Sequence, residues 1–535
     1  MVLTRVLAVA LVVAQAGAEV PLTLAPLFAD HAVLQRDEPV PIWGGASPGE
    51  EITVSFAGQS RNATAGADGR WSVALAPLAA SATGSDLTVS VRPPSDRGPG
   101  SAVTLHDILV GEVWLCSGQS NMEFTLAEAR DAKREIAAAT NPLIREIKVK
   151  HKVSTVPLET AATTGWRSST PQVAGTFTAV GYFFAREIAA KLQVPVGIVD
   201  SSWGGTPVEA WMDGAALASD PKFAVVNERW QQTMAEYSAN KIIYAQAKAA
   251  QAKAEAAAVA EGPEAHARWL KDNARLRDPS DPTHWLSFGV ASLRSPVPRG
   301  PGDSATPTGL FNGMINPLIP EAVRGILWYQ GEKNAERAEE YHALFSAMIT
   351  AWRARFGQPE LPFYWVNLAN LAFVDDTHRQ WAFLRGAQTE TLSLPATGQA
   401  IAIDLGEDNN IHFGNKQDIG HRLALLAENR LYHLSCEDTG PTFTSVRPEG
   451  AALRITFEHA RGLAVKGDSI NSLELAGADR VFHPGTGRID GTSLVVESAA
   501  VPRPLAIRYA WLNAPQANLY NAAGLPAVPF RSDDW

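Results

Sequence analysis

A regular alternation of short apolar segments with longer helical patterns runs from about residue 106 to residue 439, and it limits the folds open to this chain. The apolar segments lack polar alternation, which is typical of strands buried on both faces. Strands of this kind, separated by helices, form a parallel sheet that binds ligands at the carboxyl ends of its strands. The segments are DILVGEVWLCS, VPVGIVDSS, RGILWYQ, LPFYWVNLA and GQAIAIDLG, and the helical patterns include TAVGYFFAREIAAKL, AERAEEYHALFSAMITAWRARFG, HRQWAFLRGAQTETL and KQDIGHRLALLAENRLY. We therefore predict an α/β fold.

Two flanking regions have a different pattern. From residue 19 to residue 105, and again from 440 to 535, short β-rich runs such as EEITVSFAG and LAIRYAWLN are separated by Gly, Pro and Asp. Short strands with turn residues at this spacing are typical of small antiparallel sandwiches. We expect a small β-sandwich-like domain on each side of the α/β domain.

An insertion divides the α/β domain into two parts, residues 106–213 and 308–439. Within the insertion, residues 214–307, the stretch from 224 to 260 is rich in Ala, Lys, Glu and Gln, which favours a long helix with few large apolar side chains. A Pro-rich loop follows from Asp278. The pattern predicts an insertion that lies over the sheet, with a low-complexity linker as the alternative.

The first 18 residues, MVLTRVLAVALVVAQAGA, combine the basic Arg5 with an apolar run and the small residues Ala16-Gly17-Ala18. This pattern is typical of a secretory signal peptide that is cleaved after Ala18. A short membrane anchor is the alternative, but the run falls short of the roughly 20 residues that cross a bilayer. We expect an exported protein, periplasmic or extracellular, without a transmembrane segment.

Charge and cysteine usage exclude some classes of function. The net charge of −10, from 46 basic and 56 acidic residues, argues against a nucleic-acid partner, which requires a basic surface. The two cysteines, Cys116 and Cys436, form one disulfide at most, and buried free thiols are the simpler state. The spacing of cysteines and histidines matches no zinc-site pattern, so we expect no metal.

Residues 118–122 read GQSNM, and the serine of this motif stands where a parallel sheet binds its ligands. Ser120 follows the apolar strand that ends near Cys116 and precedes a helix that begins near Asn121. Its hydroxyl can be a nucleophile that benefits from the positive end of the helix, or it can simply cap the helix. A second GQS ends at Ser60, beside a turn in the N-terminal β-rich region, where we expect a solvent-facing loop.

A serine nucleophile requires a base, and His412 is the best placed of the twelve histidines. It lies in IAIDLGEDNNIHFGNK, in the loop between the last apolar strand and the last helix. In a parallel sheet this loop reaches the same edge as Ser120. His421 lies inside the following helix, where we expect a surface or packing role.

Two other strand ends carry residues that suit an oxyanion hole. Gly204 and Gly205, in SSWGG, allow a backbone amide to approach a substrate because neither has a Cβ atom. Gln330 and, less directly, Asn334 follow the strand RGILWYQ in WYQGEKN. The alternatives are an ordinary glycine turn and a polar strand-end cap. Candidate catalytic residues therefore follow four strands, and together they favour an active site at this edge of the sheet.

Five motifs resemble, in order and spacing, the sialate O-acetylesterase branch of the SGNH/GDSL hydrolases: GQSNM, SSWGGTPVEAW, PTGLFNGMINPL, WYQGEKNA and DLGEDNNIHFGNKQDIGHRLA. The start PLFADHAVLQRDEPVPIWGGASPGE and the tail RYAWLNAPQANLYNAAGLPAVPFRSDDW are similar to the flanking regions of that branch. The resemblance implies a three-layer α/β/α SGNH-hydrolase domain with a parallel sheet and accessory β domains. It also implies ester cleavage by a serine mechanism without a metal or other cofactor.

Carried onto this chain, the resemblance makes Ser120 the nucleophile and, through its backbone amide, an oxyanion donor. Gly205 supplies a second backbone donor, and Gln330 replaces the asparagine of other SGNH enzymes, with Asn334 as a weaker candidate. His412 is the general base, which takes the proton of Ser120 and returns one to the departing sugar hydroxyl. Water then resolves the acetyl-enzyme.

The group that orients His412 departs from the family pattern. SGNH enzymes usually have an aspartate three residues before the histidine, and this chain has Asn409 there, between Asp408 and Asn410. An amide can fix the imidazole tautomer, but it stabilises imidazolium less well than a carboxylate does. Asp408, Asn409 and backbone carbonyls therefore remain open as partners of His412, with Asp404 as a more distant alternative.

Two further departures leave the substrate open. The family usually has Pro after the histidine and Ser in the QGES stretch, where this chain has Phe413 and Lys333. Sialic acid and acetylated plant polysaccharide such as xylan or xyloglucan are both candidate bearers of the ester. Four aromatic residues near the expected edge either stack on a sugar or pack in the core: Trp203, Trp211, Trp328 and Tyr329.

We therefore expect an exported carbohydrate O-acetylesterase whose partner is an acetylated sugar. Two other classes remain as alternatives. A glycan-binding protein that has lost catalytic activity is one, because it would explain the absence of an aspartate three residues before His412. A glycoside hydrolase needs a pair of carboxylates, such as Glu332 and Asp408.

Overall fold

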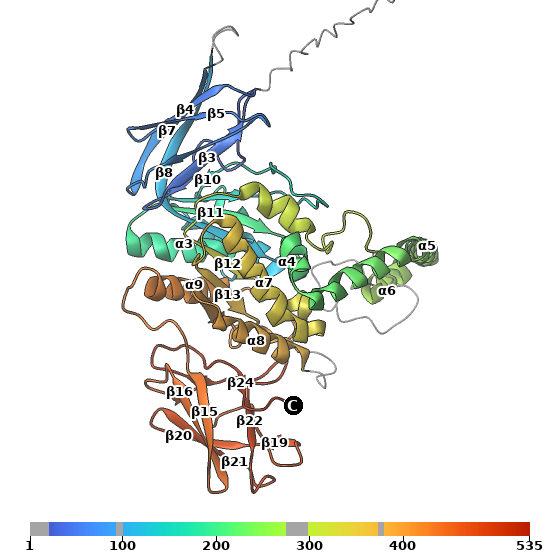
Figure 1. Ribbon diagram of the computed structural model, residues 1–535. Helices are drawn as coiled ribbons and strands as arrows, with labels where there is room; N and C mark the ends of the chain where they lie inside the picture. Colours follow the sequence, from blue (N-terminus) through green and yellow to red (C-terminus); the bar gives the residue numbers. More distant parts are fainter. Residues whose placement is uncertain (1–20, 93–99, 274–297, 373–378) are drawn as a thin grey trace, which may run out of the picture.

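The structure is a computed structural model that describes residues 21–92, 100–273, 298–372 and 379–535. The expected signal peptide and most of the expected Pro-rich loop lie outside these residues. Figure 1 shows β-rich parts at both ends of the molecule with an α/β part between them.

A mixed sheet forms the centre of the molecule, with the order β10-β9-β11-β8-β12-β13-β14 along its main path. Every neighbouring pair from β9 to β14 is parallel, whereas β10 joins β9 antiparallel. The α/β class is therefore confirmed, but the sheet is not purely parallel as predicted, because β10 and strands of the N-terminal region join it antiparallel. The strands are β8 (Ser101–Gly118), β9 (Ile144–Lys148), β10 (Arg167–Ser168), β11 (Val196–Ser202), β12 (Gly325–Tyr329), β13 (Phe363–Asn367) and β14 (Thr397–Ile401).

Four long helices accompany this sheet in two contacting pairs. Helix α3 packs on α9, and α7 packs on α8. The α3–α9 contact is close because α9 has Gly420 at the crossing, where an added Cβ atom would lie 2.5 Å from Phe183 Cβ. The bounds are α3 (Ala179–Leu192), α7 (Ala338–Phe356), α8 (Gln380–Glu390) and α9 (Lys416–Arg430), with two short helices, α1 (Ser120–Glu123) and α2 (Ala132–Ala137), after β8.

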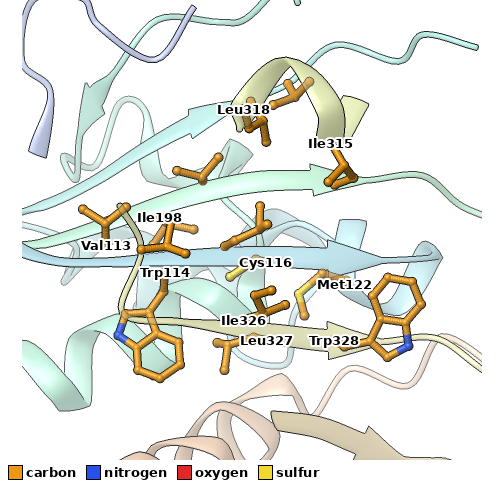
Figure 2. Packing of buried hydrophobic residues seen from close by; sticks show 14 of the residues in the cluster. Val113, Trp114, Cys116, Met122, Ile198, Ile315, Leu318, Ile326, Leu327 and Trp328 are labelled. Atoms are coloured by element: carbon orange, nitrogen blue, oxygen red, sulfur yellow. The ribbon is translucent and has the colours of Figure 1, made fainter. Parts of the chain in front are cut away.

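Strand β8 belongs to two parts of the molecule at once. Its first half pairs antiparallel with β7 (Ser81–Arg92) of the N-terminal region, and its second half, from Glu112 to Gly118, pairs in parallel with β11 and β12. The strand has 18 residues and runs without a break across the boundary expected at residue 105. Figure 2 shows Val113, Trp114 and Cys116 of this strand in the core of the central sheet.

The N-terminal strands share one continuous hydrophobic core with the central sheet, whereas most of the C-terminal strands surround a separate core. The N-terminal strands are β1 (Thr23–Leu24), β2 (Val33–Gln35), β3 (Val40–Gly45), β4 (Glu51–Phe56), β5 (Gln59–Thr64), β6 (Arg70–Leu75) and β7 (Ser81–Arg92). The C-terminal strands are β15 (Thr442–Glu449), β16 (Ala452–Glu458), β17 (Ala464–Val465), β18 (Leu473–Ala476), β19 (Phe482–Pro484), β20 (Thr486–Asp490), β21 (Ser493–Glu497), β22 (Ala506–Tyr509), β23 (Leu519–Tyr520) and β24 (Phe530–Arg531).

The insertion contains the predicted long helix, but its described helices α5 (Ala224–Glu261) and α6 (Pro263–Asn273) do not lie over the sheet. Helix α4 (Gly214–Ala218) leads to α5, and α6 contacts α5. Figure 1 shows α5 and α6 as an arm that projects from the α/β part. In α5 only Val226 is buried, because its Ala, Lys and Gln side chains give it no apolar face. None of the described helices is long and apolar enough to cross a bilayer.

Candidate active site

Ser120 and His412 meet at the carboxyl edge of the central sheet. His412 Nε2 lies 2.8 Å from Ser120 Oγ, although 292 residues separate the two in the sequence. Both side chains are partly buried. A nucleophile within hydrogen-bond reach of an imidazole nitrogen is the geometry in which the imidazole can take the hydroxyl proton.

The backbone at the end of β8 presents Ser120 to this edge. Gly118 has a φ of +133°, and a Cβ atom there would lie 2.2 Å from the carbonyl oxygen of Tyr329. Gln119 N donates to the same carbonyl over 2.9 Å, which ties the turn to the neighbouring strand β12. Helix α1 then begins at Ser120 itself. The close approach and the sharp turn require glycine, so the residue before Gln119 is fixed by geometry.

A second turn, after β11, lies against the serine. Gly204 N donates to Glu123 Oε2 over 2.8 Å, and a Cβ atom on Gly204 would lie 3.2 Å from Ser120 Cβ. Gly205 has a φ of +71°. Among the described residues, the backbone N–H groups of Ser120 and Gly205 have no hydrogen-bond acceptor. Two unoccupied donors beside a nucleophile can stabilise a developing oxyanion.

The two expected amide donors, Gln330 and Asn334, are engaged elsewhere. Gln330 Nε2 donates to the carbonyl oxygen of Thr206 over 3.1 Å and to Asn334 Oδ1 over 2.7 Å, so both of its hydrogens are used. Asn334 Nδ2 donates to Glu209 Oε2 over 2.8 Å. Both side chains are almost completely buried. In this arrangement they hold the loop after Gly205, and their direct role at the oxyanion stays a prediction.

None of the three side chains expected as partners of His412, Asp408, Asn409 and Asp404, forms a hydrogen bond with the imidazole. Asp408 Oδ1 accepts a hydrogen bond from Asn370, and Asp404 accepts two from Arg422, over 2.6 and 2.8 Å. Asn409 is exposed. Within the part of the chain that the structure describes, His412 Nδ1 has no hydrogen-bond partner. The orienting acid expected from the family pattern is therefore not in place in this structure.

The surroundings of His412 favour its neutral form. Burial lowers the pKa of His412, the positive charge of Lys416 lowers it further, and the carboxylate of Glu128 acts in the opposite direction. Removal of water destabilises the imidazolium cation more than the neutral ring. The net effect is a histidine that is ready to accept a proton.

Sequence reasoning missed a buried polar network that joins the serine turn to the histidine loop. Asn121 Nδ2 donates to Glu332 Oε1 and to the carbonyl oxygen of Ile411, over 2.7 and 3.0 Å. Lys416 Nζ donates to Asn121 Oδ1 over 2.8 Å and to the carbonyl oxygen of Phe413 over 2.7 Å. One signal for this network was available, because a lysine at the first position of a helix opposes the helix dipole and needs another reason to be there.

The family model described as carbohydrate esterase, sialic acid-specific acetylesterase, matches residues 110–265 and 307–428, which is more than half of the chain. The chain belongs to this family of carbohydrate esterases. It is a carbohydrate O-acetylesterase.

Relatives and a solved structure agree with this assignment over nearly the whole chain. The sialate O-acetylesterase of Rattus norvegicus is 26% identical over 559 residues, covering 96% of this chain and 95% of its own. That of Homo sapiens is 26% identical over 538 residues, covering 91% and 88%. The crystal structure of a carbohydrate acetylesterase from Xanthomonas citri is 37% identical, covers 96% of this chain and 100% of its own, and has a TM-score of 0.76.

The aromatic residues near the edge of the esterase separate into two groups. Trp211, Trp328 and Tyr329 have no exposed surface and pack in the core. Trp203 is partly exposed, directly before Gly204, and its ring stacks on His151 with centroids 4.1 Å apart. Of the four, only Trp203 has exposed surface.

Other residues singled out in the sequence have structural roles. His421 lies on α9 and pairs with Glu187 over 2.9 Å, as a surface residue. Ser60 is exposed as expected, but it lies in strand β5 and not in a loop, because Ser60 pairs with Ser55 of β4. Cys116 and Cys436 are free thiols, so the esterase has no disulfide between them.

One group among the described residues brings three potential metal ligands together, Glu437, Asp438 and His459, whose donor atoms lie within 4.8 Å of one another. His459 Nδ1 lies 2.6 Å from Glu437 Oε1, and Asp438 accepts hydrogen bonds from Arg430. These contacts already pair the charges of the group, so it is explained as an ion-pair cluster.

Proposed function

We propose that this esterase removes O-acetyl groups from sugars by a serine mechanism with an acetyl-enzyme intermediate. The 2.8 Å contact between Ser120 Oγ and His412 Nε2 is the observation that carries the proposal. The free N–H groups beside Ser120 support it, because a tetrahedral intermediate needs donors at that place.

In the first half of the reaction, Ser120 Oγ attacks the acetyl carbonyl carbon while His412 Nε2 takes the hydroxyl proton. The backbone amides of Ser120 and Gly205 donate to the oxyanion. The bond between the carbonyl carbon and the sugar oxygen then breaks, and His412 returns its proton to that oxygen. The free sugar hydroxyl leaves, and the acetyl group stays on Ser120.

In the second half, water repeats the attack on the acetyl-enzyme. His412 takes a proton from the water, the new oxyanion forms at the same donors, and the ester bond to Ser120 breaks. Acetate is released and Ser120 regains its proton from His412. In this cycle Ser120, His412 and the two backbone amides carry out each step, and water is the co-reactant.

We further propose the three-layer SGNH arrangement for the α/β part and export of the chain. The contacting pairs α3–α9 and α7–α8 support two helical layers. Export rests on the first 18 residues of the sequence. N-terminal sequencing of the mature protein checks it, and a mature chain that still begins at Met1 would contradict it.

The sugar that carries the ester is the finer part of the proposal, and we assign Trp203 as the ring it contacts. Sialic acid, xylan and xyloglucan are the candidates. A panel of O-acetylated forms of each identifies the substrate by acetate release. In the same panel Trp203→Ala should raise KM several-fold for the preferred sugar and leave a generic acetyl ester unchanged, because a stacked ring contributes about 1 kcal/mol. Equal effects on both substrates would exclude a sugar contact.

Ser120→Ala tests the mechanism. Without the hydroxyl no acetyl-enzyme forms, so acetate release should fall by about 10³-fold or more, and His412→Ala should lose activity to a similar extent. Asp408→Ala and Asn409→Ala complete the set and should have small effects, because neither side chain contacts His412. Acetate release by Ser120→Ala at the wild-type rate would overturn the serine mechanism, and sugar cleavage without acetate release would favour a glycoside hydrolase.

A further inference from the structure

We propose that Lys416 and Asn121 are positioning residues that hold the His412 loop against the serine turn, a task that an aspartate performs in other serine hydrolases. The inference rests on the serine mechanism proposed above and names additional residues for it.

The carbonyl oxygens of the residues before and after His412 are both held by this network. Asn121, the residue after the nucleophile, donates to the carbonyl oxygen of Ile411, and Lys416 donates to that of Phe413. Lys416 also donates to Asn121 Oδ1, which closes a connection between the two loops. The backbone before and after His412 is therefore fixed relative to Ser120. An imidazole whose main chain is fixed on both sides needs less from a partner on its side chain.

A buried ammonium group is costly, and the structure compensates Lys416 in an unusual way. Lys416 is fully buried, and its Nζ lies 3.8 Å from the ring centroid of Phe413, 4.6 Å from that of Phe124 and 5.8 Å from that of Tyr329. Aromatic faces attract a cation when water is excluded. Phe413 is the residue that stands where the family usually has proline, so this departure forms one wall of the lysine site.

Carboxylates complete the electrostatic surroundings of Lys416. Glu332 is joined to it through Asn121, and its Oε2 is buried without a hydrogen-bond partner. Burial lowers the pKa of Lys416 to about 7, while the charges of Glu332, Glu407 and Glu128 act in the opposite direction. Below neutral pH the lysine is therefore charged, and its charge opposes protonation of His412.

The substitution Lys416→Met separates positioning from folding. Methionine has a similar length and packs well against aromatic rings, so the melting temperature should not fall. The hydrogen bonds to Asn121 and to the carbonyl of Phe413 are lost, so the His412 loop is released. We expect kcat for acetate release from an acetyl ester to fall by about 100-fold, with KM within about threefold of wild type.

The pH profile supplies a readout that a merely structural role would not move. Because the charge of Lys416 lowers the pKa of His412, its removal should shift the acidic limb of kcat/KM to higher pH. Lys416→Gln keeps an N–H donor but not the charge. It should recover part of kcat while its acidic limb moves as far as that of Lys416→Met.

The control is Lys466→Met, which removes the lysine whose Nζ lies 3.4 Å from the ring centroid of Tyr520. It should retain wild-type kinetics. Wild-type kcat and an unmoved acidic limb in Lys416→Met, or in Lys416→Gln if the Met variant does not fold, overturn the proposal. If Ser120→Ala is inactive in the same assay, the serine mechanism survives that outcome, whereas an active Ser120→Ala overturns the mechanism first.

Discussion

At the scale of single residues, the proposed base His412 has no carboxylate on its second ring nitrogen within the described part of the chain. The closest candidates in sequence, Asp408 and Asp404, are bonded to Asn370 and Arg422 instead. Burial, rather than an ion pair, is the main influence on its charge. A triad aspartate would raise the pKa of the histidine, so the arrangement here gives a weaker base that stays neutral to lower pH.

We expect the acidic limb of kcat/KM to lie below the ordinary histidine pKa of about 6.5. In the proposed mechanism the neutral imidazole is the active form, and a lowered pKa of His412 means that activity is lost only as the pH falls through that lower value. Glu128→Gln removes the carboxylate that raises the pKa of His412, so the acidic limb of kcat/KM of this variant should lie at a still lower pH. Rate measurements on a soluble acetyl ester over the acidic and neutral range check both statements, and a limb above the ordinary value would contradict them.

Ser120 and His412 could be predicted because Ser120 comes just after a strand with a clear apolar pattern, and His412 lies between a strand and a helix that have such patterns. The family resemblance then gave them roles. The polar network that joins their loops could not be predicted in this way. Lys416 and Asn121 are 295 residues apart, and the sequence does not show whether a lysine is buried or exposed. The partner of His412 could not be predicted for a related reason. Asp408 is near His412 in sequence, but its carboxylate accepts a hydrogen bond from Asn370.

At the scale of elements, the strands with wholly apolar sequences were predicted and β9 was not. Its sequence IREIK includes three charged residues, and two of them, Arg145 and Glu146, are buried. Arg145 is compensated by Asp107, whose carboxylate lies 2.8 Å away, and Glu146 accepts from the backbone of Thr178. A buried strand can contain charged residues when distant segments supply their hydrogen-bond partners, and the hydrophobic pattern of the sequence does not show these partners.

The crossing of α3 and α9 gives a prediction about stability. Gly420→Ala places a Cβ atom 2.5 Å from Phe183 Cβ and 2.8 Å from the backbone nitrogen of Phe184, so the helices must separate. We expect a loss of about 1–3 kcal/mol in the free energy of unfolding, measured by denaturant titration. Gly214→Ala, at a helix position with nothing within 4 Å of the added atom, is the control and should change stability little. Equal stability of the two variants would show that the crossing can relax.

At the scale of the whole molecule, the N-terminal strands and the central sheet form one body, and the C-terminal region packs against it. The continuous core joins the first two. Asn513 Oδ1 accepts from Trp381 N over 2.9 Å, and Tyr520 donates to Asp404 over 3.2 Å, so the C-terminal region contacts segments next to the histidine loop. The sequence predicted a β region, an α/β region and a second β region in that order. It did not predict that the first boundary would lie inside a strand.

A substitution in the N-terminal core should therefore affect the activity of the esterase at high temperature. Ile52→Ala, at a fully buried site in β4, should cost about 2–5 kcal/mol and lower the temperature at which acetate release is lost. Ile455→Ala makes the same change at an equally buried site in the separate C-terminal core and should lower that temperature less. A thermal activity profile of Ile52→Ala that matches wild type would mean that the N-terminal region unfolds on its own.

The unbroken course of β8 has a consequence for building chimeric esterases. The backbone that leaves the N-terminal region is the same backbone that delivers Ser120, so that region cannot be exchanged as a cassette at a linker. A junction that adds or removes one residue between Leu109 and Glu112 would turn every later side chain of the strand to the opposite face. Successful exchanges will have to keep the count of residues through β8 and splice in the loops before it.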